Sequence, residues 1–374
     1  MNKEKILQIL KNCVAVVVII SLLIIIFYQN RDRDLFKFGK DKKEGEVTSS
    51  QQTENGFIVG DVKKLGDRVA YINTTSYRIF DAYTEDSVSK IALAEPTLHT
   101  DGNYAVCYDI GSLNAVVLKN EKECYSLKLS NNILSAKVNK NGYLFIATDK
   151  EGYNCECLVY NNRGEAIFKW DVSKSEFLDG DINNSNNLMA LSLASAGEKM
   201  LLGEIELIDI TQAEVISRQS YDKEAFYKVD FNANNAFTAV GSKNLKYFNS
   251  NGSEKWSYSY GGKTISKVDT SNPDFMLLAF EKSGSGIKGN STDVCVVNRL
   301  GKQTSEASFD YIVDAVSVGE GNAALAFGKS IFVLNQNLKT KKKVYSESAV
   351  KKIALFSDNE HIFVINSSGG IILE

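Results

Sequence analysis

Residues 225–258 read AFYKVDFNANNAFTAVGSKNLKYFNSNGSEKWSY and form the clearest copy of a repeat that continues, with variation, to the end of the chain. Alternation of apolar and polar residues, or a short apolar run, predicts four strands at residues 227–231, 236–240, 245–248 and 255–258. Clusters of Asn, Gly and Ser separate these strands at residues 232–235, 241–244 and 249–252. The stretch therefore predicts one antiparallel sheet of four short strands joined by tight turns.

The same unit recurs along the chain. Eight positions open a predicted second strand just after a turn-forming cluster, at spacings of 36 to 48 residues: Arg68, Tyr104, Tyr143, Leu188, Ala236, Phe275, Ala323 and His361. A four-stranded unit of this length is typical of a β-propeller blade. Since one blade cannot bury both faces of its sheet, the blades must pack around a common axis. Eight copies favour an all-β propeller of eight blades, and seven blades are the alternative.

The last copy ends at Glu374 after its third strand. A blade of three strands either leaves an open edge or takes a strand from elsewhere in the chain. Residues 47–52 are the available candidate for that fourth strand.

One segment before the repeats is strongly apolar. Residues 13–28, CVAVVVIISLLIIIFY, carry no charge, and at ~1.5 Å per residue they cover roughly 24 Å of a ~30 Å hydrocarbon core. No small-residue cleavage pattern follows, which disfavours a cleaved signal peptide. A buried helix of a soluble protein would be the only helix in an all-β chain. We therefore predict a transmembrane signal-anchor helix over residues 13–30, after a short cytoplasmic N-terminus over residues 1–12.

The orientation in the membrane has two interpretations. Three lysines precede the apolar segment and six basic residues follow it soon after, and this count alone favours a cytoplasmic propeller. However, long domains are translocated largely regardless of flanking charge, and an N-terminal signal-anchor usually keeps its basic end inside. We expect a polar, flexible tether over residues 31–56 and an extracytoplasmic propeller over residues 57–374.

The hairpins between predicted third and fourth strands carry a family resemblance. VYNNRGEAIFKW at 159–170 and YFNSNGSEKW at 247–256 resemble repeats of quinoprotein (PQQ-like) and WD40-like propellers, in which a turn ending in Gly and a closing Trp are typical. With its apolar N-terminal segment, the whole chain resembles an uncharacterised, domain-of-unknown-function family of single-pass membrane propellers from Gram-positive bacteria. The resemblance implies a fold and a location but no activity. The chain departs from the pattern because only Trp170 and Trp256 are present.

Composition and motifs argue against several functions. The net charge of −3 and the absence of a basic stripe disfavour nucleic acid as a partner. His99 and His361 are the only histidines; each stands beside a strand-opening turn, where a surface or capping role is ordinary. No Ser, Cys or carboxylate stands at triad spacing from either one, so we predict no catalytic residues.

Cofactor and metal motifs are also incomplete. The G-x-G-x-x-G at residues 284–289 precedes a predicted strand instead of a helix and therefore predicts a loop. Asp179, Asp181, Asn183 and Ser185 have the spacing of a calcium loop, but the required Gly and Glu are missing, so an Asn-rich turn is expected. The two Trp residues fall in outer hairpins, unsuited to stacking on a quinone. We predict no metal and no cofactor.

Five cysteines fall in the predicted propeller: Cys107, Cys124, Cys155, Cys157 and Cys295. Their number is odd and no C-x-x-C is present. Cys155 and Cys157 share one strand face, where a disulfide between them is difficult. We expect all five to be small buried side chains.

The best functional indication is the length of the loops between second and third strands. These loops are longer in the third, fourth and sixth copies, at residues 149–154, 195–199 and 281–293. Since they all emerge on one face of a propeller, their length favours a binding face there, although neutral variation in loop length is the alternative. The candidate ligand-binding residues are Lys150, Glu151, Tyr153, Lys199, Lys282 and Lys288.

Together these observations predict a membrane-anchored, non-catalytic binding or scaffolding module for a protein or an envelope polymer. A PQQ-like enzyme or small-molecule sensor, and an envelope assembly factor, are the alternatives.

Overall fold

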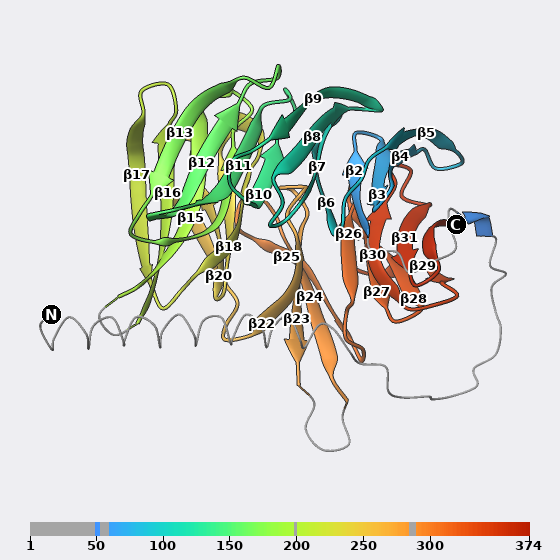
Figure 1. Ribbon diagram of the computed structural model, residues 1–374. Coiled ribbons are helices and arrows are strands. Elements are labelled where there is room, and N and C mark those ends of the chain that lie inside the picture. Colours follow the sequence, from blue (N-terminus) through green and yellow to red (C-terminus); the bar gives the residue numbers. More distant parts are fainter. Residues whose placement is uncertain (1–48, 53–59, 198–199, 284–288) are drawn as a thin grey trace, which may run out of the picture. The chain divides into compact units, whose positions relative to one another are not determined.

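The computed structural model describes residues 49–52, 60–197, 200–283 and 289–374. These residues form eight antiparallel sheets of four strands each, with one short 3-10 turn, η1 (Ala233–Asn235) (Figure 1). The predicted membrane helix at 13–30 and most of the predicted tether lie outside the described residues. In the part that is described, no helix has the length and apolar character needed to cross a membrane.

Blades 1 to 4 each use four consecutive strands: β2 (Gly60–Leu65), β3 (Arg68–Asn73), β4 (Ser76–Phe80) and β5 (Glu85–Lys90); β6 (Pro96–Asp101), β7 (Tyr104–Asp109), β8 (Asn114–Lys119) and β9 (Lys122–Lys128); β10 (Ile133–Val138), β11 (Leu144–Lys150), β12 (Tyr153–Tyr160) and β13 (Ala166–Val172); β14 (Glu176–Ile182), β15 (Leu188–Ala196), β16 (Leu201–Asp209) and β17 (Glu214–Asp222).

Blades 5 to 7 follow the same order: β18 (Phe226–Phe231), β19 (Phe237–Gly241), β20 (Asn244–Phe248) and β21 (Glu254–Ser259); β22 (Thr264–Asp269), β23 (Met276–Lys282), β24 (Ser291–Val297) and β25 (Gln303–Phe309); β26 (Ala315–Val318), β27 (Asn322–Phe327), β28 (Ser330–Asn335) and β29 (Thr340–Tyr345). Blade 8 contains β30 (Val350–Leu355), β31 (Ile362–Asn366), β32 (Gly369–Leu373) and β1 (Ser49–Gln52).

The predicted repeat agrees with these strands. Each of the eight second strands begins within one residue of its predicted opening position. The turn predicted at residues 232–235 contains two left-handed residues, Asn234 with φ 65° and Asn235 with φ 59°, which asparagine adopts more readily than most side chains do. The eight-bladed, all-β prediction is confirmed.

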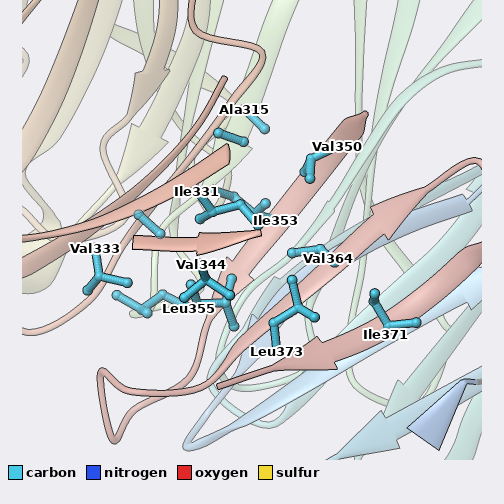
Figure 2. Close-up of a cluster of buried hydrophobic side chains, with 13 residues drawn as sticks. Ala315, Ile331, Val333, Val344, Val350, Ile353, Leu355, Val364, Ile371 and Leu373 are labelled. Carbon is cyan, nitrogen blue, oxygen red and sulfur yellow. The ribbon is translucent and has the colours of Figure 1, made fainter. Parts of the chain in front are cut away.

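The core consists of eight apolar clusters, one between each pair of neighbouring blades. Figure 2 shows the cluster between blades 7 and 8, in which Ile331 and Val344 of one sheet lie near Ile353 and Val364 of the next. The cluster between blades 8 and 1 joins the two ends of the propeller. In it, the Phe363 ring centroid lies 5.2 Å from that of Tyr71 and 4.9 Å from that of Phe80.

Strand β1 supplies the fourth strand of blade 8. It runs antiparallel to β32, with Ser49 opposite Leu373 and Ser50 opposite Ile372. The short blue strand beside the C-terminus in Figure 1 is this segment. The candidate at residues 47–52 is therefore confirmed as the strand that completes the last blade, although it precedes residue 57, where the propeller was predicted to begin.

The hairpin glycines have a packing role between blades. Gly301 adopts φ +74°, and a Cβ placed there would lie 2.7 Å from Cδ2 of Trp256 in blade 5. Trp256 Nε1 also donates a hydrogen bond to the Arg299 carbonyl at 3.0 Å. A Cβ placed at Gly164 would likewise meet the side chain of Tyr125, which belongs to the preceding blade. The aromatic residue on one outer strand thus covers the glycine turn of the next blade.

Candidate functional sites

The first strand of each blade has one edge that no strand of its own sheet covers, and side chains of the preceding blade bind this edge. Six backbone N–H groups donate to such side chains: Leu98 to Asp61, Val138 to His99, Val229 to Asp179, Phe231 to Asp181, Val318 to Asp269 and Leu355 to Ser317. Buried backbone donors need partners. Polar residues on first strands therefore satisfy the inner edge and connect the blades.

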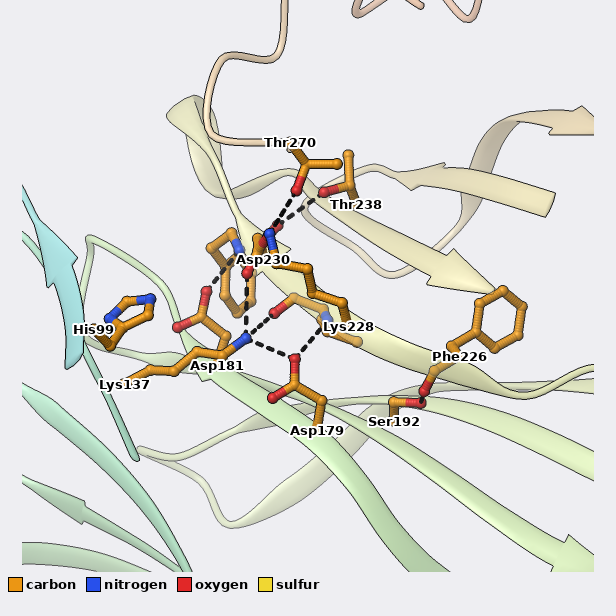
Figure 3. Close-up of polar contacts among 12 residues, drawn as sticks. His99, Lys137, Asp179, Asp181, Ser192, Phe226, Lys228, Asp230, Thr238 and Thr270 are labelled. Atoms are coloured by element: carbon orange, nitrogen blue, oxygen red, sulfur yellow. Dashed lines mark hydrogen bonds and ion pairs between the residues drawn. The ribbon is translucent and has the colours of Figure 1, made fainter. Parts of the chain in front are cut away.

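Charged side chains on the first strands of blades 3 to 5 contact one another. We call the group of Lys137, Asp179, Asp181, Lys228, Asp230 and Thr270 the axial cluster (Figure 3). Lys137 Nζ lies 2.6 Å from Asp179 Oδ2 and 3.2 Å from Asp230 Oδ1. Lys228 Nζ lies 2.5 Å from Asp230 Oδ2 and donates to Thr270 Oγ1 at 2.8 Å. The cluster spans four blades, because Thr270 follows the first strand of blade 6.

Burial and charge act in opposite directions on these groups. Burial raises the pKa of Asp181 to about 8, although Lys137 opposes the shift. Burial likewise raises the pKa of Asp179. For Asp230 the burial effect is outweighed by Lys228 and Lys137, which lower its pKa. Burial disfavours the charged form of Lys137. The Asp179 and Asp230 carboxylates favour it more strongly, and the pKa of the ammonium is raised. Lys137 and Asp230 therefore both favour their charged forms, each with two oppositely charged partners.

The axial cluster links neighbouring blades and has a structural role. Asp179 Oδ2 accepts from both Lys137 Nζ and Val229 N, and Asp181 accepts from Phe231 N and Ile182 N. Each of these carboxylates thus joins its own blade to a neighbour. No group of three or more His, Cys, Asp or Glu residues in the described ranges is arranged to hold a metal ion. No sequence pattern pointed to this cluster, because its members come from four separate repeats.

Asp179 and Asp181 require a correction. The sequence analysis placed them in an Asn-rich turn, but they lie on strand β14, before the turn. Their spacing of two residues puts both on one face of the strand, toward blade 5. The spacing of two residues was the sequence signal for a shared strand face. It also matched part of a calcium-loop pattern by coincidence.

The histidines also differ from expectation. His361 is 6% exposed, so a surface position was wrong, while its contact with the turn fits a capping role: its Nδ1 lies 2.6 Å from Asp358 Oδ2. His99 lies on the first strand of blade 2 and accepts from Val138 N at 3.3 Å. Burial lowers the pKa of His99 to about 3, so the imidazole is neutral at physiological pH.

Four cysteines are buried as predicted: Cys107, Cys155, Cys157 and Cys295. Cys124 is exposed on β9, so the prediction was wrong for this residue. The Sγ atoms of Cys155 and Cys157 lie 3.8 Å apart and are not bonded. Trp170 and Trp256 lie on outer strands, as the sequence analysis placed them.

The propeller has two faces, which we name by the connections that each face carries. The loop face carries the loops between second and third strands and the connections between blades; the hairpin face carries the other two sets of turns. On the loop face, Lys150 forms ion pairs with Asp171 at 2.7 Å and Glu156 at 3.0 Å, and its Nζ lies 4.6 Å from the centroid of the Tyr153 ring. Glu151 is exposed in the adjoining turn.

The other predicted binding residues lie elsewhere. Lys282 is on blade 6, where its Nζ lies 2.6 Å from Asp293 Oδ2. Lys199 and Lys288 lie outside the described residues. The structure thus groups Lys150, Glu151 and Tyr153 in one hairpin and places Lys282 three blades away. Their role in binding stays a prediction.

The extra length of the third and fourth copies is in strands. In blade 3, β11 continues to Lys150 and β12 begins at Tyr153, so the expected loop at 149–154 is only a two-residue turn. In blade 4, β15 and β16 are nine residues each. These blades therefore project longer hairpins on the loop face, where longer loops were predicted.

The loop face carries most of the exposed apolar side chains. Seven of the twelve large hydrophobic residues that are exposed in the described ranges lie on it: Ile110, Tyr153, Met200, Leu201, Tyr227, Tyr311 and Tyr345. They come from blades 2 to 7. Only Tyr83 and Leu300 of this set lie in turns of the hairpin face. Single exposed apolar residues are ordinary, so the difference between the two faces is the informative feature.

Comparisons with known proteins agree with the fold. A family model described as "Family of unknown function (DUF5711)" matches residues 38–371. The chain is similar to the solved structure titled "Crystal Structure Of The C-Terminal WD40 Domain Of Sif2", with a TM-score of 0.62 and 12% identity over 87% of this chain and 97% of that one. None of the curated proteins compared with this chain matches it. At this identity the structural likeness shows a WD40-like propeller fold alone.

Proposed function

The chain belongs to the DUF5711 family of unknown function, and we propose that it is a membrane-anchored, extracytoplasmic β-propeller that acts as a non-catalytic binding or scaffolding module. Its ligand is a protein or another polymer of the cell envelope. The membrane part of this proposal is supported by the uncharged apolar segment at residues 13–28.

The observation that carries the binding role is the distribution of exposed apolar residues. At strand ends and in a connection of the loop face, Tyr153, Tyr311 and Tyr345 are 43%, 60% and 38% exposed. Tyrosine is enriched at protein interfaces because its ring buries apolar area while its hydroxyl stays hydrogen-bonded. Burying these rings against a partner would remove apolar area from water on one face of the molecule.

Cross-linking in intact cells followed by purification of the full-length chain tests the proposal. Envelope proteins or polymers should be captured by the wild type and lost when Tyr153 and Tyr311 are both changed to Ser. Since each tyrosine is partly exposed, we expect the double variant to fold. Each truncation of a central interface aromatic commonly costs about 1–4 kcal/mol of binding free energy.

Leu300→Ser is the matched control, because Leu300 is 60% exposed in a turn of the hairpin face. Capture should be unchanged in this variant. Equal loss in both variants, or no loss in the double variant, would contradict binding through the loop face. Protease added to intact cells should digest the propeller; complete protection would contradict the extracytoplasmic location.

A further inference from the structure

A pocket of about 450 Å³ lies between blades 5 and 6, on the flank near the loop face. Its aromatic wall contains Tyr258, Tyr260 and Phe280. Its polar lining includes Lys263, Lys282, Asp293, Gln303, Glu306 and Ser308. The volume falls within the range of pockets that bind small molecules.

Two lysines converge at one end of this pocket. Lys263 Nζ and Lys282 Nζ lie 3.0 Å and 2.6 Å from the same carboxylate oxygen, Asp293 Oδ2. Ser308 Oγ donates to the other oxygen at 2.7 Å. Two ammonium groups against one carboxylate leave an excess positive charge at this end. Both lysine side chains are about half exposed, at 46% and 52%, so a ligand can reach them.

Tyr260, one of the lining residues, carries a buried hydroxyl. Tyr260 is only 3% exposed, and its ring centroid is 5.2 Å from that of Phe280. Its O–H has no hydrogen-bond partner among the residues that the structure describes. A buried hydroxyl without a partner costs free energy. An acceptor on a bound molecule would remove that cost.

The opposite end of the pocket is acidic. Glu306 Oε2 accepts from Gln303 Nε2 at 2.8 Å, and Gln303 Oε1 accepts from Tyr258 O–H at 2.5 Å. Carboxylate and amide oxygens at this end are suited to accept hydrogen bonds from ligand hydroxyls. The pocket therefore has a cationic end, an accepting end and an aromatic wall between them.

We propose that this pocket binds a small hydroxylated organic anion, with its carboxylate or phosphate held by Lys263, Lys282 and the Tyr260 hydroxyl. The anion shares the two ammonium groups with Asp293, and its hydroxyls reach Gln303 and Glu306. The ring of Tyr258, the aromatic lining residue that is only partly buried, covers the apolar side of the ligand. The titration below measures small-molecule binding without any partner, so this proposal and the docking of a partner on the loop face can fail independently.

Isothermal titration of the full-length chain with D-glucuronate, glucose 6-phosphate and glucose tests the site. At least one anion should bind with a Kd below about 10 mM, and glucose should bind about tenfold more weakly or not at all, because it lacks the charged group. The two anions distinguish a carboxylate site from a phosphate site, and binding of either supports the proposal. Failure of both anions, or equal binding of glucose, overturns it.

Two variants separate binding from folding. Lys282→Gln should weaken binding of the anion about tenfold, because hydrogen bonds between charged groups are stronger than those between neutral groups. Tyr260→Phe should weaken it several-fold while leaving Tm unchanged or higher, because the variant removes a buried group without a partner. Lys302→Gln, an exposed lysine on the hairpin face that does not line the pocket, is the charge-matched control. Unchanged anion affinity in both pocket variants overturns the assignment.

Discussion

The axial cluster shows how single residues hold the blades together. Lys137 is 7% exposed and bonds Asp179, the Val229 carbonyl and Asp230, which come from two other blades. Such a buried charge is stable only when its partners compensate the cost of desolvation. Its removal therefore affects several blades at once.

Lys137→Met should lower the free energy of unfolding by about 3–5 kcal/mol, because it leaves buried carboxylates without their cation. Urea denaturation at neutral pH measures this change. Lys329→Met removes an exposed lysine of blade 7 and should change stability by less than about 0.5 kcal/mol. Equal effects of the two substitutions would contradict the compensating role of Lys137.

The raised pKa of Asp181 makes stability depend on pH. Burial raises this pKa from 3.8 to about 8. Between these values the native state binds a proton that the unfolded state lacks, so this group lowers stability as pH rises toward 8, by at most about 1.4 kcal/mol per unit.

Asp181→Asn removes that dependence, because the amide is neutral at every pH. The stability of the variant relative to the wild type should therefore rise between pH 5 and pH 8 and level off above it. Thermal or urea unfolding across this range gives the comparison. Parallel pH profiles of the two proteins would show that Asp181 is ionised in the fold.

At the scale of elements, the hairpin between third and fourth strands connects neighbouring blades. Gly301 needs its left-handed conformation for the turn, and the absence of a Cβ leaves room for the ring of Trp256. Trp256 and the glycine turn thus belong to different blades but form one contact. The sequence repeat of glycine and aromatic residue follows from this packing.

Gly301→Ala should destabilise the protein more than Gly321→Ala does. Both glycines have positive φ, at +74° and +71°, so an alanine costs about 1–2 kcal/mol at either position. Only at Gly301 would the new methyl meet Trp256; nothing lies within 4 Å at Gly321. The extra cost should be about 1–3 kcal/mol, as for overpacking.

Unfolding midpoints of both variants, with tryptophan emission as a second signal, test this expectation. The emission of Gly301→Ala should shift, since Trp256 is one of two tryptophans. Equal midpoints and unchanged emission would mean that the ring moves aside without cost.

At the scale of the molecule, the closed ring depends on both ends of the chain. The cluster between blades 8 and 1 and the pairing of β1 with β32 join segments more than 270 residues apart. Without β1, strand β32 would present an open edge, and open edges favour association between chains.

Deletion of residues 49–52 should lower the unfolding temperature and promote oligomers or aggregates. Thermal scans and light scattering after size exclusion measure both effects. Deletion of residues 40–43 in the predicted tether is the length-matched control and should leave the propeller monomeric if the wild type is monomeric. Indistinguishable behaviour of the two deletions would contradict a structural role for β1.

The fold class follows from the sequence alone, because strand periodicity and turn residues are local properties that recur in each repeat. The repeats also favoured eight blades over seven and left residues 47–52 as the candidate closing strand. Even the second-strand positions, such as Arg68 and Leu188, follow from the turns before them. The axial cluster and the pocket beside Tyr260, by contrast, exist only in the folded chain. Their members lie on different repeats, and which side chains meet depends on blade number, register and burial, which no single stretch of sequence contains.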